Sequence, residues 1–231
     1  MNFFRHPRHG PLPAILLLLT FGTGVVDAIS ILGLGRVFVA NMTGNIVFIG
    51  FALAGAPGYS VWGSLVALAA FLVGATIGGV VIARMTSNRG GLLRNSLALQ
   101  LGLIVAALAI SAISGNRLGA AMQVVVLALA ALGLGLQNAV VRRLAVPDMT
   151  TTVLTMTLTG IASDLRNRDT ATALRRSLAV LAMLVGATLG GLIVLDVGTT
   201  AGLAVVVGVL AIALVGAMVV TRKVADWQRF A

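Results

Sequence analysis

A short polar motif, "NMTGN", interrupts a strongly apolar part of the chain and places Asn41, Thr43 and Asn45 directly before an apolar run. Asn and Thr side chains at the start of a helix accept hydrogen bonds from its first free N–H groups. The same N–H groups, together with the helix dipole, attract negative or strongly polar groups. We therefore expect these three residues to cap a short helix near residues 42–55 and to bind a small anionic or polar solute.

A second polar motif, "DMTTTVLTMTLTG", covers residues 148–160 and is rich in hydroxyl groups. It predicts a second short helix near residues 150–163. Hydroxyl groups both donate and accept hydrogen bonds, so they suit the lining of a polar path as well as a helix cap. We expect Thr151, Thr152 and Thr155 to form the second half of the solute site.

The acidic residue Asp27 lies inside the first apolar run, in the stretch "TGVVDAIS". A charged side chain near the centre of a membrane span costs roughly 2.5–3.5 kcal/mol on insertion scales, and it commonly marks an ion or proton pathway. Thr23 and Ser30 stand four residues before it and three after it, so all three share one helical face. This arrangement favours Asp27 as the carrier of a coupled proton or cation.

Two structural interpretations of Asp27 stay open beside that one. In the first, its carboxylate accepts hydrogen bonds from the Asn and Thr groups of the first motif, or it pairs with Arg36. In the second, it lies close enough to the outer interface of the membrane to be solvated.

The composition predicts a multi-pass membrane protein embedded in a lipid bilayer. Of its 231 residues, 59% are hydrophobic and only 10% are charged. Cysteine is absent and the two histidines, His6 and His9, both lie in the N-terminal tail, which excludes disulfides and thiolate chemistry. No phosphate-binding loop, dinucleotide fingerprint or zinc signature is found, so we expect no cofactor and no metal. The long apolar segments, each about the length that a bilayer demands, cover residues 12–34, 60–84, 92–114, 119–141, 173–195 and 199–221.

An internal repeat divides this single membrane domain into two halves, about residues 1–114 and 115–231. The stretch "FLVGATIGGVVI", which starts at Phe71, and the stretch "MLVGATLGGLIV", which starts at Met183, are identical at seven of twelve positions. The separation of Phe71 and Met183 along the chain therefore defines the offset of the repeat.

The repeat also aligns the polar candidates of the two halves. The same offset sets Thr43 against Thr155, and a one-residue adjustment sets Asp27 against Asn138. Gln137 directly precedes Asn138. One half therefore offers a titratable carboxyl group and the other offers neutral amides, and we expect Gln137 and Asn138 to contribute to the same solute site.

The basic residues predict how the two halves are oriented. The chain has 16 Lys and Arg against 6 acids, and these charges lie between the apolar segments, which indicates membrane orientation and no nucleic-acid partner. If both short helices cross the membrane, giving eight spans and parallel halves, 10 basic residues lie on the cytoplasmic side and 6 on the outer side. If neither crosses, 14 lie on the cytoplasmic side and 2 on the outer side, which fits the usual excess of basic residues in cytoplasmic loops better. We therefore expect six spans, inverted halves, two re-entrant or half helices and cytoplasmic N- and C-termini, with the eight-span parallel arrangement as the alternative.

Three stretches of the chain resemble the YoaK family of bacterial inner-membrane proteins, which is catalogued as a domain of unknown function. They are "GVVDAISILGLGRVFVANMTGNIVFIG" over residues 24–50, "GLQNAVVRR" over residues 135–143 and "TTVLTMTLT" over residues 151–159. The resemblance implies the cytoplasmic membrane of a bacterium and several spans, and it supplies no substrate or reaction. Met156 stands where the family pattern suggests a small residue, and we expect it to narrow a path near the second motif.

These patterns favour a small-solute transporter or channel, coupled to a proton or ion through Asp27, over an enzyme. One alternative is a structural or regulatory membrane protein whose buried polar groups only specify packing. Another is an intramembrane enzyme, for which Asp27 lacks a histidine or cysteine partner in the spans. Six spans are also compatible with a homodimer.

Overall fold

Six long apolar helices make up most of the molecule in the computed structural model, which describes residues 9–84, 88–114, 118–147, 149, 151–152, 154–222 and 225–230. The long helices are α1 (Leu12–Gly33), α3 (Val61–Arg84), α4 (Arg89–Ile113), α5 (Ala120–Leu144), α7 (Thr170–Asp196) and α8 (Thr199–Thr221). Each contains a segment long and apolar enough to cross a membrane. The six predicted long helices are therefore confirmed, and their ends lie within a few residues of the predicted ones.

Two shorter helices separate the long ones, as predicted. They are α2 (Met42–Leu53) and α6 (Leu154–Arg166), and a 3₁₀ turn, η1 (Asp226–Gln228), lies near the C-terminus. At 1.5 Å per residue, α2 and α6 extend only about 18–20 Å, which is less than the roughly 30 Å of a hydrocarbon core. The predicted start of the second short helix at residue 150 is wrong, because Thr151 and Thr152 precede α6 and lie outside regular structure. Asp148, Thr150 and Val153 of that motif lie outside the described residues, as does His6.

The chain reverses sharply between α1 and α2. Gly35 and Arg36 both adopt positive φ angles, of 90° and 59°, a conformation that costs glycine little and other residues more. The next residues, from Val37 to Ala40, are mostly buried although they form no helix. The turn therefore carries an irregular segment back into the molecule before α2 begins.

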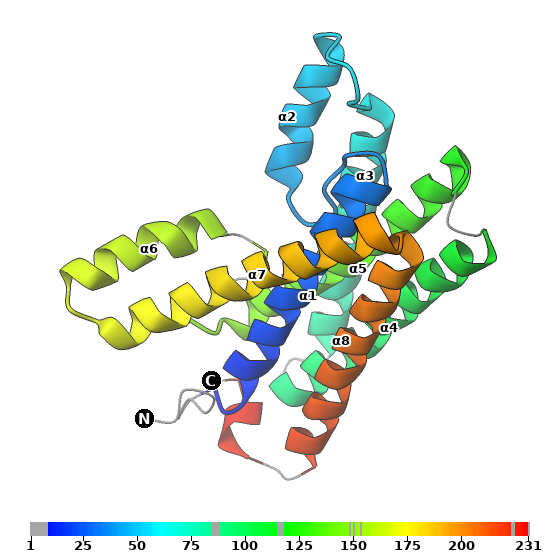
Figure 1. The fold of residues 1–231 in the computed structure, drawn as a ribbon. Helices are drawn as coiled ribbons and strands as arrows, with labels where there is room; N and C mark the ends of the chain where they lie inside the picture. The colour runs from blue at the N-terminus through cyan, green and yellow to red at the C-terminus, as the bar shows by residue number, and fades with distance from the viewer. Residues whose placement is uncertain are drawn as a thin grey trace.

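Helices α1 and α5 occupy the centre of the molecule. About two thirds of the apolar segment is buried in each, 67% in α1 and 61% in α5, against 17% in both α3 and α7. Helix α1 packs against α7 and α8, and α5 packs against α3 and α4. Figure 1 shows α2 beside α3 and α6 beside α7, so that the two short helices project from the core on different sides (Figure 1).

Glycines allow the backbones to touch at two helix crossings. A Cβ atom at Gly74 of α3 would overlap the carbonyl oxygen of Leu132 in α5, and one at Gly186 of α7 would overlap that of Phe21 in α1. The partner helices use glycine too, since a Cβ at Gly24 would overlap the backbone of α7. Such small-residue contacts let helices approach closely where lipid offers no hydrophobic drive for association. The repeated "GATIGG" and "GATLGG" stretches are therefore packing surfaces.

A buried arginine ties the ends of the chain to the helices. Arg89, which is 7% exposed, donates to the backbone carbonyl of Leu144 at 2.5 Å. Its Nη2 lies 2.9 Å from Nδ1 of His9, and its guanidinium stands 5.8 Å from the ring centre of Phe230. Arg89 therefore has a structural role beyond the orientation signal that the sequence indicated.

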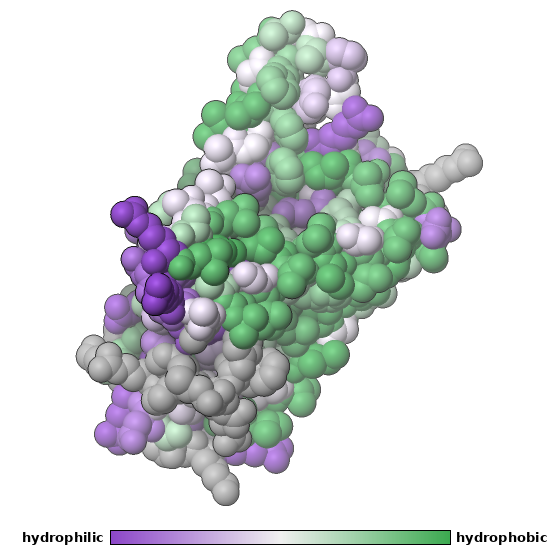
Figure 2. Space-filling view, turned by 60° about the vertical axis from the view of Figure 1, so that its left-hand side comes forward, coloured by the Kyte–Doolittle hydropathy of each residue, from purple (hydrophilic) through white to green (hydrophobic). Residues whose placement is uncertain are grey.

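The surface is mainly apolar, as expected for a protein surrounded by lipid. Figure 2 shows apolar side chains over most of one face, with hydrophilic residues concentrated towards its edges (Figure 2). Hydrophilic atoms also lie in the hollow below the lobe that carries α2 in this view (Figure 2).

Replacing Gly74 by alanine tests the α3–α5 crossing. The added methyl group must displace the backbone of Leu132, so we expect a loss of about 1–3 kcal/mol in the free energy of unfolding, as for overpacking of a core. The matched control is Gly79→Ala in the same helix, where the new Cβ meets nothing within 4 Å. Thermal unfolding in detergent should separate the two variants, and equal midpoints would contradict this account of the crossing.

Candidate functional site

The first polar motif forms the start of α2. Asn41 is the N-cap, and its Oδ1 accepts a hydrogen bond from the N–H of Gly44 at 3.2 Å. Thr43 lies exposed in the first turn. The expected cap is therefore present, and Asn41 supplies it.

Asn45 has a different role from the predicted one. Its side chain is completely buried, where it accepts from the N–H of Phe38 at 2.9 Å and donates to the carbonyl of Phe38 at 2.6 Å. The expectation that Asn45 caps the helix is corrected, because its amide points back at the preceding segment. This pair of bonds satisfies backbone groups that lie outside any helix, which a membrane protein must do with its own side chains.

A cavity of about 670 Å³ opens where α2 and α6 begin. The polar residues that line it come from both halves of the chain and include six of the nine predicted site residues: Asp27, Asn41, Thr43, Asn138, Thr152 and Thr155. The apolar lining consists of Phe38, Ala40, Met42, Gly44, Val47, Phe48, Phe71, Leu154 and Met183. Residues far apart in the sequence thus lie around one cavity.

Asp27 lines this cavity from α1. Its Oδ1 atom is buried and has no hydrogen-bond partner among the described residues. The alternative in which Asp27 pairs with Arg36 is not found: within the described ranges no ion pair joins the two, and Arg36 lies beside Gly58. Ser30 donates to the backbone carbonyl of Asp27 at 3.0 Å and not to its carboxylate. Asp27 therefore contributes a carboxyl group to the cavity wall, and one of its oxygens is buried without a partner among the described residues.

Asn138 occupies the corresponding place in the second half. It donates to the hydroxyl of Thr152 at 2.9 Å, and that hydroxyl donates back to Oδ1 of Asn138 at 3.1 Å. These reciprocal bonds hold the segment before α6 against α5. They also explain why Thr152 stays outside the helix that the sequence predicted there.

Gln137 lies behind the cavity in a buried polar network. Its Oε1 accepts from Gln100 at 2.7 Å, and its Nε2 donates to Thr151 at 3.0 Å and to Thr23 at 3.3 Å. All four side chains are less than 5% exposed. The network links α1, α4 and α5 to the segment before α6, so Gln137 and Thr151 support the cavity wall without lining it.

The sequence missed the aromatic part of the cavity. Phe38 and Phe48 stack with ring centres 5.4 Å apart, and Phe71 lines the cavity from α3. Phe71 and Met183 are the first residues of the two repeated stretches, so the repeat itself carried a signal for them. Met156 lies outside the lining and is 72% exposed, so the expectation that it narrows a path there is wrong.

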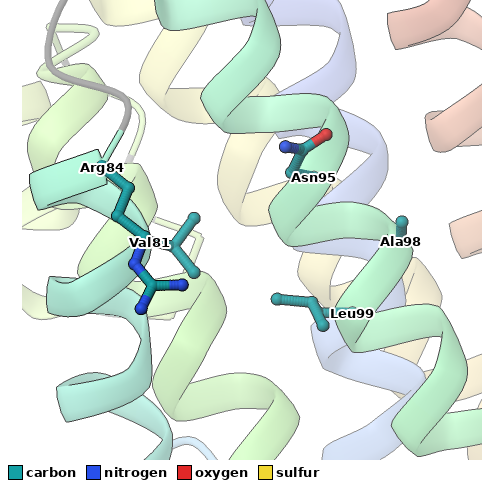
Figure 3. A pocket seen from close by; sticks show the side chains of 5 residues that line it. All are labelled: Val81, Arg84, Asn95, Ala98 and Leu99. Carbon is teal, nitrogen blue, oxygen red and sulfur yellow. The ribbon is translucent and has the colours of Figure 1, made fainter.

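A second cavity, of about 530 Å³, lies between α3 and α4. Val81 and Arg84 line it from α3, and Asn95, Ala98 and Leu99 line it from α4 (Figure 3). It contains none of the predicted site residues. In the part of the chain that the structure describes, no group of three or more His, Asp or Glu side chains is placed to hold a metal ion.

The helices and their apolar surface define a multi-pass α-helical membrane protein. Over residues 15–216 the chain matches the model of the family "Protein of unknown function (DUF1275)", and it belongs to that family. It is also 30% identical over 155 residues to the UPF0700 transmembrane protein YoaK of Bacillus subtilis (strain 168), an alignment that covers 67% of each protein. The predicted family is thereby confirmed. No solved structure matches the chain.

Replacing Asn45 by alanine tests the connection between α2 and the segment before it. The change leaves the N–H and carbonyl of Phe38 without partners, and each unsatisfied buried group costs about 1–3 kcal/mol. We expect the segment to loosen, so that a cysteine at Val37, which is 1% exposed, reacts faster with a thiol reagent. The control is Asn41→Ala in the same background, where loss of a helix cap costs about 1 kcal/mol and leaves these two bonds in place. Unchanged reactivity in the Asn45 variant would contradict the assignment.

Proposed function

We propose that this protein is a small-solute transporter or channel of a bacterial inner membrane. The observation that carries the proposal is the cavity of about 670 Å³ between the starts of α2 and α6. Asp27 lies in its wall, and Oδ1 of this residue has no hydrogen-bond partner among the described residues. Short helices that begin in the interior and present polar ends to a shared site are the pattern of many transporters. The site comprises Asn41, Thr43, Thr152, Thr155 and Asn138, and Asn45, Thr151 and Gln137 hold it in shape.

The proposed membrane arrangement is six spans with inverted halves and cytoplasmic termini. Support comes from Figure 1, where α1 and α4 run in one general direction and their repeat counterparts α5 and α8 run in the opposite one (Figure 1). The glycine contacts also correspond, since Gly74 meets α5 and its repeat counterpart Gly186 meets α1. The distribution of basic residues, 14 inside against 2 outside, favours the same arrangement.

Asp27 is the proposed site of proton or ion coupling. An ionisable group among spans is costly, and a purely structural carboxylate would be expected to have hydrogen-bond partners on both oxygens. Asn138, its counterpart, has both ends of its amide engaged with Thr152. Asp27, in contrast, has an oxygen without a partner among the described residues. This contrast supports a role in which Asp27 binds and releases a proton or ion in each transport cycle.

The apolar side chains that α2 and α6 leave exposed are compatible with either lipid or a second copy of the chain. Ile46 and Leu53 of α2 are 62% and 74% exposed, and Leu165 of α6 is 61% exposed. The proposed site is complete within one chain, so the proposal holds for a monomer and for a homodimer.

Cysteine labelling tests the proposed topology, because the natural chain has no cysteine. In the six-span arrangement the loop after α2 lies outside, so we expect Ala54→Cys to react with a membrane-impermeant thiol reagent on intact cells. Val197→Cys is the positive control and Asn167→Cys the negative one, since their loops have the same location in both arrangements. Protection of position 54, with both controls behaving as stated, would establish eight crossing helices and remove the main geometric support for a central site.

Transport itself is tested with purified protein in liposomes. We expect the protein to move small polar solutes or protons across the bilayer, measured with a pH-sensitive dye and a panel of small ions and neutral solutes. Asp27→Asn should reduce coupled flux to the level of empty liposomes, because the variant cannot exchange a proton. Asp196→Asn, which changes an exposed acid at the end of α7, should leave the flux unchanged.

A combination of two results would contradict the transport proposal. If the natural protein moves nothing and Asp27→Asn cells are indistinguishable from the parent, the buried polar groups serve packing only. In that case Asn138→Ala should lower the yield of folded protein, because Thr152 loses its partner, without altering any flux.

A further inference from the structure

One acidic side chain, Asp27, lies among the described residues that line the cavity. Among the described residues that line it, Asp27 is the one ionisable group, and no lysine, arginine or histidine is present. Arg36, the basic residue closest in sequence to the lining, lies beside Gly58 and outside the lining set. Among the described residues, a solute that enters the cavity therefore meets one carboxyl group and no basic side chain.

The aromatic side chains that line the cavity, Phe38, Phe48 and Phe71, come from the same half of the chain as Asp27. The rings of Phe38 and Phe48 stack nearly parallel, with 15° between their planes. Of the polar groups from the second half, Thr152 and Asn138 are already bonded to each other. Aromatic faces attract cations, and most strongly where water is excluded.

The N-termini of the short helices attract an anion less strongly than the sequence alone suggested. A helix N-terminus is equivalent to roughly half a positive charge, and its effect fades within the first turn. At α2 this end is already capped, because Asn41 accepts from the N–H of Gly44. Next to Asp27 in its ionised form, a bound anion would be repelled.

We infer that the cavity takes a small organic cation, an ammonium group attached to an apolar moiety. The ammonium group would lie at Asp27, and the apolar moiety would lie against Phe38, Phe48 and Phe71. This inference rests on the proposed function in naming the substrate class of that site, and it replaces the anion expected from the helix ends.

Three probes of one shape and different charge test this inference. Benzylammonium, benzyl alcohol and benzoate are titrated by calorimetry into the full-length protein in detergent at neutral pH, with protein-free micelles as the blank. We expect benzylammonium to bind about tenfold more tightly than benzyl alcohol and benzoate to bind most weakly, because of the carboxylate and the aromatic faces. In Asp27→Asn the preference for benzylammonium should disappear, and in Asp196→Asn it should remain.

A pair of variants in α2 separates the aromatic contribution from general packing. Phe48 lines the cavity and Phe51 does not, although both rings contact Tyr59, at centre distances of 4.9 and 5.4 Å. We expect Phe48→Leu to weaken benzylammonium binding about threefold to tenfold relative to benzyl alcohol. Phe51→Leu loses a similar contact with Tyr59, and this variant should still bind benzylammonium more tightly than benzyl alcohol.

The outcomes distinguish this inference from the transport proposal. Tighter binding of benzoate, absence of binding by all three probes, or a cation preference that survives Asp27→Asn would overturn the inference. Flux of an anion through liposomes would likewise overturn it while supporting transport. Cation-selective binding without any flux would support an organic cation as the ligand of the cavity and would overturn the transport proposal.

Discussion

Contact between helix backbones at glycines is the interaction on which the rest of this structure depends. Gly186 brings α7 against α1, and Gly74 brings α3 against α5. Lipid is as apolar as the side chains it surrounds, so helices in a membrane associate through close packing and hydrogen bonds. A methyl group at either crossing would separate the helices that carry the cavity walls.

The crossings also determine where the cavity lies. Phe71, whose carbonyl meets Gly135, and Met183, whose carbonyl meets Gly24, both line the cavity. Asp27 lies three residues beyond Gly24 and lines it as well. The cavity is therefore less than one helical turn from each backbone contact, where movement is most restricted.

Two kinds of polar group surround this position, and they differ in how well they are satisfied. The amide of Asn45 and the network around Gln137 are fully engaged with protein groups, and such satisfied networks make a buried site rigid. Within the described part of the chain, one oxygen of Asp27 has no partner. An unsatisfied buried acid lowers stability, and this cost is consistent with the proposal that Asp27 binds a charged species.

Much of the architecture was predictable from the sequence because each helix depends on local properties. Runs of about twenty apolar residues indicated the six long helices, and the internal repeat aligned Thr43 with Thr155 and Asp27 with Asn138. The cap at Asn41 was likewise a local feature of residue type and position. The motif around Thr151 showed the limit of this reasoning, because a partner on α5 holds Thr152 out of the helix.

By itself the sequence determined the class of protein, the number of long helices and six of the residues that line the cavity, since hydropathy and repeat spacing act along the chain. Only the tertiary structure decided that Asn45 turns back to Phe38, that Gln137 lies behind the cavity wall, and that Phe38 and Phe48 line the cavity. It also decided that the guanidinium of Arg36 lies beside Gly58. Each of these depends on which side chains meet across helix crossings, and contacts between residues distant in sequence leave no periodic signal in the chain.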